Sequence, residues 1–147
     1  FPGGRDEILA ELVQWEVRRF WRRVAAATAD RSRLEDRLVV GLMRAHQVLS
    51  EHSLLEGLLA READVLLPLL ERAELAVNDA LCGYIREMLD AEPSDALRPG
   101  LDLDEAAAYI ANLARSLIAS PAGWDMASEP TVRRLVRTQF VGGILRR

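Results

Sequence analysis

Apolar residues recur at steps of three and four along nearly the whole chain, which is the spacing of amphipathic helices. The first series follows Gly3-Gly4 and predicts a long helix over about residues 5–27. The arginines at positions 18, 19, 22 and 23 occupy much of its other side, which we interpret as a solvated face. Phosphate contact is the minor alternative for these arginines, because nearby acidic residues weaken their electrostatic field. The apolar face of this helix is formed by Ile8, Leu9, Leu12, Val13, Val17, Phe20, Trp21 and Val24.

Capping residues divide the middle of the chain into three further helices. Asp30 or Ser32 can accept a hydrogen bond from the first amides of a second helix. Ser53 and Glu56 have the spacing of a capping box at the start of a short third helix, "LLEGLLARE". The longest stretch covers residues 63–92, with Asp64 as a plausible cap and a proline near its start.

Two loops rich in proline and glycine, "PSDALRPGLD" and "PAGWDMASEP", precede the last two predicted helices. Asp102 or Asp104 can cap the fifth helix, and Pro130 is in position to start the sixth. No period-two alternation bounded by turns occurs, so we expect no strands. The pattern therefore predicts an all-α fold of six helices in a single domain, residues 1–147.

The last two predicted helices combine small residues with an apolar stripe. Alanines at five positions between 106 and 114, and the Gly142-Gly143 pair, would let two helices approach closely. An open apolar stripe of this size is larger than soluble monomers usually tolerate, so we expect a two-fold homodimer. The residues expected at its interface are Ile110, Leu113, Leu117, Leu135, Val136, Gln139, Phe140 and Gly143.

Composition narrows the class of protein. All 19 basic residues are arginine, and the net charge of −4 gives the chain no global basic field for nucleic acid. The single cysteine, Cys82, excludes an internal disulfide and suits a reducing compartment, so we expect a cytoplasmic protein. No apolar run approaches the roughly 20 residues that a membrane span needs, so we expect no membrane partner.

Candidate catalytic and metal-binding groups are sparse. His46 and His52 are six positions apart, whereas a metal-binding pair on a helix needs three or four. Cys82 lies in a buried-looking helix with no histidine near it in sequence, which favours a structural thiol. The acidic residues are scattered, and no glycine-rich phosphate loop follows a strand. We therefore expect no metal site, no cofactor and no enzymatic activity.

A ligand pocket is the most specific site that the pattern predicts. Three of the predicted helices carry wide apolar faces that also hold polar or amphipathic residues, which orient ligands in small-molecule sites. No obvious buried arginine pair matches a strong anion, so the expected ligand is an uncharged or weakly polar lipophile. The alternative is that these side chains simply fill the core. The residues expected to line the pocket are Trp15, Leu42, His46, Leu58, Leu66, Asn78, Leu81 and Tyr84.

The first nine residues, "FPGGRDEIL", resemble the junction that ends the DNA-binding headpiece of TetR-family transcriptional regulators. In that family a short turn of this kind follows the recognition helix and leads into a connecting helix. The rest of the chain is similar in layout, with six helices and an "LRPGLDLDEAA" loop and helix start. The positions that match the junction are Phe1, Pro2, Gly3, Gly4, Asp6 and Leu9.

The resemblance implies a regulatory domain, with residues 1–4 as the remnant of a junction to an absent helix-turn-helix domain. The last two helices would form a four-helix bundle with those of a partner subunit. A small lipophilic effector would enter between the first four helices, displace the connecting helix and release a repressor from operator DNA. Operator DNA would be bound only through the absent domain.

A second class of protein has the same composition. A stand-alone helical module that binds a lipid, a small molecule or a protein would show the same periodicity, but it would not need the "FPGG" turn.

Overall fold

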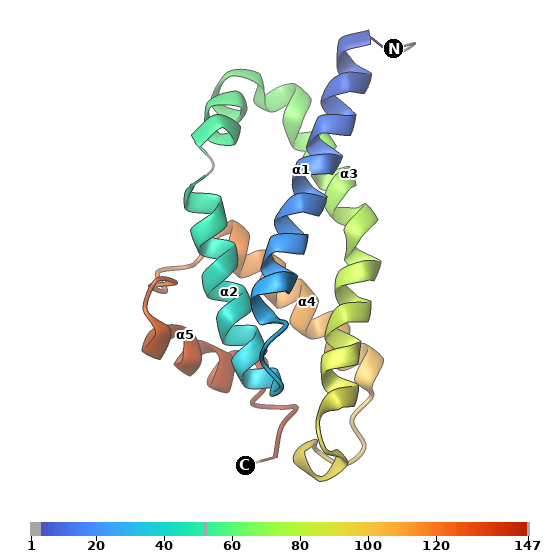
Figure 1. Ribbon diagram of the computed structural model, residues 1–147, viewed down its shortest axis with the longest axis vertical. Coiled ribbons are helices and arrows are strands. Elements are labelled where there is room, and N and C mark those ends of the chain that lie inside the picture. Colours follow the sequence, from blue (N-terminus) through green and yellow to red (C-terminus); the bar gives the residue numbers. More distant parts are fainter. Residues whose placement is uncertain (1–3, 52, 147) are drawn as a thin grey trace.

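The computed structural model describes residues 4–51 and 53–146, and the regular structure in this part of the chain is helical (Figure 1). The predicted all-α class is confirmed. A short 3-10 turn, Ser94–Ala96, follows the third helix, and a π-helical turn, Val136–Phe140, continues the last one. The five α-helices are α1 (Gly4–Thr28), α2 (Leu34–Ser50), α3 (Ser53–Ala91), α4 (Leu103–Ala119) and α5 (Glu129–Leu135).

The other helices are arranged around α1 and α3, which are the two longest. Helix α1 packs against both α2 and α3, α4 crosses behind them against α3, and α5 packs on the side of α2 (Figure 1). Gly4, the first residue of α1, has a φ of 63°, a left-handed conformation that favours glycine. Phe1, Pro2 and Gly3, on which the resemblance partly rests, lie outside the described residues.

The six expected helices correspond to five labelled helices because α3 contains two of them. Helix α3 runs from Ser53 to Ala91 and consists of two helical segments that meet at a kink at Glu62, whose φ of −134° and ψ of 39° are not helical. The expected boundary at Asp64 lies two residues after this kink. Pro68 lies inside α3, where it cannot donate to the carbonyl one turn earlier.

The helix caps were predicted correctly at α4 and wrongly at α2. Asp102 accepts hydrogen bonds from the backbone amides of the second and third residues that follow it, at 2.9 and 3.1 Å. Neither Asp30 nor Ser32 caps α2, because Arg33 occupies the cap position and forms no capping bond. The amide of Leu34 instead donates to the carboxylate of Glu92, which follows the end of α3.

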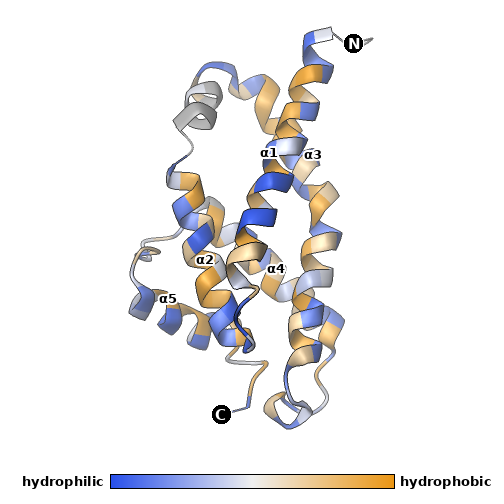
Figure 2. Ribbon diagram, viewed as in Figure 1, coloured by the Kyte–Doolittle hydropathy of each residue, from blue (hydrophilic) through white to orange (hydrophobic). Residues whose placement is uncertain are grey.

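The core consists of a large cluster and a small one. The large cluster joins α2, the lower part of α3, α4 and α5, and its fully buried members include Leu34, Leu89 and Phe140. The small cluster joins the first half of α1 to the upper part of α3. It consists of Val13, Leu66 and Ala73, with Val17, Leu69 and Leu70 packed against them. Apolar and polar residues are interspersed along both long helices (Figure 2), and several of their large apolar side chains are exposed, among them Trp15 at 51% and Leu75 at 69%.

Most of the residues expected at a dimer interface lie in the core of the single chain. Leu113 is half-buried, and Gln139 and Gly143 are exposed. Gly142 follows the last helical turn, where a side chain would come within 3.0 Å of the Thr138 carbonyl. The open stripe that motivated the dimer is therefore largely covered within the chain, and the dimer stays a prediction. The covered members are Ile110, Leu117, Leu135, Val136 and Phe140.

Candidate ligand cavity

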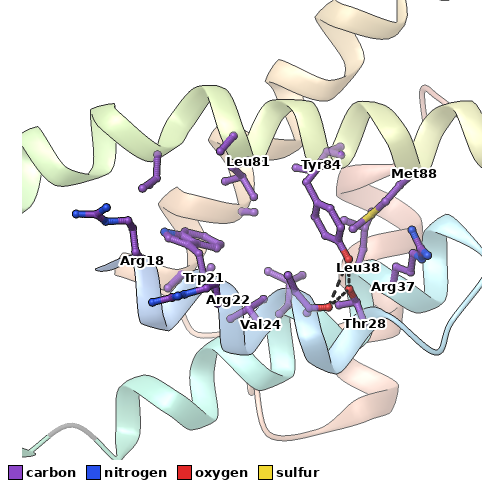
Figure 3. A pocket seen from close by; sticks show the side chains of 18 of the residues that line it. Arg18, Trp21, Arg22, Val24, Thr28, Arg37, Leu38, Leu81, Tyr84 and Met88 are labelled. Carbon is purple, nitrogen blue, oxygen red and sulfur yellow. Dashed lines mark hydrogen bonds between the residues drawn. The ribbon is translucent and has the colours of Figure 1, made fainter. Parts of the chain in front are cut away.

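A cavity of about 670 Å³ lies between the first four helices and is partly open to solvent (Figure 3). Helices α1 and α3 provide the two longest walls, α2 adds a third, and Ala114 and Ile118 of α4 contribute to the lining. Small-molecule sites in proteins usually enclose about 300–1,000 Å³, so this volume suits a ligand of moderate size. The lining is mainly apolar.

The helical repeat explains which residues reach the cavity. On α1, positions 18, 21, 22, 25 and 28 lie one turn apart on the side that faces α3. On α3, positions 77, 81, 84, 85 and 88 form the opposing stripe. Ala25 and Ala80 have side chains too short to fill the space between these stripes. Small residues at facing positions therefore leave a space that larger side chains would occupy.

Helix α1 is attached to α3 at several points. Toward the start of α1, these are the ion pair between Arg5 and Glu62 and the small cluster around Val13 and Leu66. At the end of α1, the hydroxyl of Tyr84 contacts that of Thr28 in the wall of the cavity (Figure 3). Thr28 in turn donates to the carbonyl of Ala25 at 2.8 Å. Thr28 is 2% exposed, so these bonds satisfy a buried hydroxyl.

The structure brings four of the eight expected pocket residues to the cavity: Trp15, Leu42, Leu81 and Tyr84. The other four do not contribute in the described part of the lining. Leu66 is buried in the small cluster, and the side chain of Leu58 lies outside the described ones.

His46 and Asn78, which were expected to orient a ligand, are half-buried and do not line the cavity. The polar groups of the wall are instead the hydroxyls of Thr28 and Tyr84 and three guanidinium groups. His46 and Asn78, the polar residues predicted to line the pocket, are therefore not the polar residues that line the cavity.

Arg18, Arg22 and Arg37 line the cavity, and the sequence analysis missed all three. No acidic residue occurs among the described lining residues, so the wall carries only positive formal charge. Arg37 donates through Nε to the carbonyl of Arg31 at 2.7 Å. The signal that could have revealed the first two is their spacing of four, which places them beside Trp21 on one side of α1.

The described residues of the wall include hydroxyl and guanidinium groups and no histidine, cysteine, aspartate or glutamate. Elsewhere in the described chain, no cluster of such residues could hold a metal ion. Cys82 is a half-buried free thiol on α3 that does not reach the cavity.

None of the described helices is both long enough and apolar enough to cross a bilayer.

Comparison with known proteins identifies no relative. No model of a protein family, no curated protein and no solved structure matches this chain. The functional proposal is therefore based on the lining, volume and position of the cavity.

Proposed function

We propose that this chain is the effector-binding domain of a TetR-like transcriptional regulator, which a small ligand releases from DNA. The observation that supports the proposal is the position of α1, which forms one long wall of the cavity. A ligand in this cavity touches the same helix that, in the family, connects to the DNA-binding headpiece. Binding and movement of α1 are thereby coupled through direct contact.

The attachments of α1 to α3 suggest how the movement would occur. The small cluster at Val13 lies outside the lining of the cavity, whereas the bond between Thr28 and Tyr84 is part of its wall. A ligand that fills the space better when α1 tilts away from α3 stabilises the tilted state. Only the difference in its affinity for the two states shifts their populations.

The ligand-binding part of the proposal is tested by filling the cavity. Leu81→Trp places a large ring in the wall, whereas Leu75→Trp places the same ring on α3 at a position that is 69% exposed. A compound present at about 100 times its dissociation constant adds about 2.7 kcal/mol to wild-type stability. This corresponds to a rise in melting temperature of about 5–10 °C for a domain of this size.

In a thermal-shift screen, a hit should stabilise wild type and Leu75→Trp equally and should have no effect on Leu81→Trp. Equal stabilisation of all three proteins by every hit would place binding outside this cavity. The melting temperatures of the variants without ligand control for damage to the fold.

The regulatory part of the proposal is tested by measuring the position of α1 relative to α3. Spin labels on Glu11→Cys and Asp79→Cys, in a Cys82→Ser background, report the distance between the exposed sides of α1 and α3. A regulator should change this distance when the ligand is added. In a mobility-shift assay, the product of the complete gene should release its operator at the same ligand concentration.

The cavity also supports a second candidate, a stand-alone helical module that carries a lipid or another small molecule. Such a module needs the cavity but no response of α1. Ligand binding without a change in the α1–α3 distance and without operator release would favour this class.

A further inference from the structure

We infer that the ligand of this cavity is an anionic amphiphile, whose charged head binds to Arg18 and Arg22 and whose single apolar chain lies between α1 and α3. The inference rests on the proposed function, because it names the class of ligand for the same cavity. It replaces the uncharged lipophile that the sequence analysis favoured.

The two arginines are placed to act together. They are one helical turn apart on α1, on either side of Trp21, and both line the cavity. In Figure 3 both lie at the same end of the cavity, whereas Arg37 lies at the opposite end beyond Tyr84. Two guanidinium groups this close in sequence repel each other, and an anion between them removes that repulsion.

These arginines differ from their neighbours in their partners. Arg19 lies 4.0 Å from the carboxylate of Glu16, and Arg23 lies 3.8 Å from that of Glu51. Arg18 and Arg22 form no ion pair with a carboxylate in the described part of the chain, although both are exposed. Arg18 contacts only the neutral oxygens of Gln14, at 3.4 Å. Their charges are therefore available to a ligand.

The rest of the cavity suits an apolar chain. Beyond the arginine end, the wall is formed by residues such as Val24, Leu38, Leu81 and Met88 (Figure 3). The contact between Tyr84 and Thr28 lies within this part of the wall, between Leu81 and Arg37 in Figure 3. The cavity thus has a cationic end and an apolar body, which match the two parts of an amphiphile.

Binding of four probes with the same chain tests the inference: dodecanoate, dodecyl phosphate, 1-dodecanol and dodecyltrimethylammonium. Each is titrated below its micelle-forming concentration, with the quenching of tryptophan fluorescence as the signal. The two anions should bind wild type at least about tenfold more tightly than the alcohol, and the cation should bind most weakly.

Substitutions of the arginines show where the charged head of the ligand binds. Arg18→Gln and Arg22→Gln should each weaken dodecanoate binding about fivefold and leave 1-dodecanol within about twofold. The matched control is Arg23→Gln, which removes the same charge from a residue of α1 that does not line the cavity. Arg37→Gln reports whether the head binds at the opposite end, and neither Arg23→Gln nor Arg37→Gln should change the preference for anions.

Three results would overturn the inference, and they differ in whether the proposed function is retained. If the alcohol binds as tightly as both anions, and Leu81→Trp abolishes all binding, the ligand is uncharged and the proposed function is retained. If Arg37→Gln alone removes the preference for anions, the head lies at the other end. If no probe or screened compound binds in a manner that Leu81→Trp blocks, the proposed function fails together with the inference.

Discussion

Replacing Tyr84 by phenylalanine removes one hydroxyl group from the point where α3 is bonded to the end of α1. The hydroxyl of Thr28 donates to the Ala25 carbonyl at 2.8 Å, and its oxygen can accept a hydrogen bond from the Tyr84 hydroxyl. The Tyr84 hydroxyl also lies 3.4 Å from the same carbonyl, a weaker contact. Tyr84→Phe therefore removes one good hydrogen bond and leaves the Thr28 donor satisfied.

The expected cost follows from the burial of these groups. One hydrogen bond of this kind contributes about 0.5–1.5 kcal/mol net, so Tyr84→Phe should lower the free energy of unfolding by about 1 kcal/mol. Thr28→Val keeps the shape of the buried side chain and removes both of its bonds, which should cost about 1–2 kcal/mol. The double variant cannot lose the shared bond twice, so the two changes should couple by about 1 kcal/mol.

Urea unfolding of the four proteins, followed by circular dichroism, measures this cycle. Equal m-values are the control that the denatured states are comparable. In thermal melts, each 1 kcal/mol should correspond to about 2–4 °C for a domain of this size. A coupling energy within about 0.3 kcal/mol of zero would refute the reasoning, because the two hydroxyls would then act independently.

Two further predictions concern the core and the start of α2. Phe140→Ala should lower the free energy of unfolding by about 3–5 kcal/mol in urea titrations, because Phe140 is 0% exposed in the single chain. A variant of unchanged stability that only dissociates a dimer in sedimentation would contradict this burial. Glu92→Gln should cost about 1 kcal/mol, because it removes the charged acceptor of the Leu34 amide at a helix N-terminus. The control Glu87→Gln, an exposed position on α3, should cost less than about 0.5 kcal/mol in the same assay.

Features that depend on neighbouring residues were predictable. The bounds of α1 differ by one residue at each end from the expected 5–27, because an apolar repeat is visible within a single helix. The cap at Asp102 was also predictable, since its bonds join residues two and three positions apart. Pro130 lies in the first turn of α5, one residue after its start at Glu129 and two after the capping residue Ser128.

Features that depend on distant residues were not predictable in the same way. The amide of Leu34 is capped from 58 positions away, so no local pattern points to Glu92. The kink at Glu62 lies two residues before the boundary expected at Asp64, but only the structure shows that the two helical segments meet there without an intervening loop. Phe140 belongs to an apolar stripe that either a partner subunit or the same chain could cover. Only the packing of the helices shows that other helices of the same chain cover it.

The sequence by itself determined that this protein is all-helical, where most of its helices run, and that their apolar faces exceed what a single helix can bury. Only the tertiary structure decided which parts of those faces meet and which leave a space. Arg18 and Arg22 show the physical reason. Their positions on α1 are evident from the helical repeat, but whether a helical face meets solvent or a cavity depends on the helices opposite. Those helices lie far away in the sequence, and their packing places a pair of charges beside an apolar space.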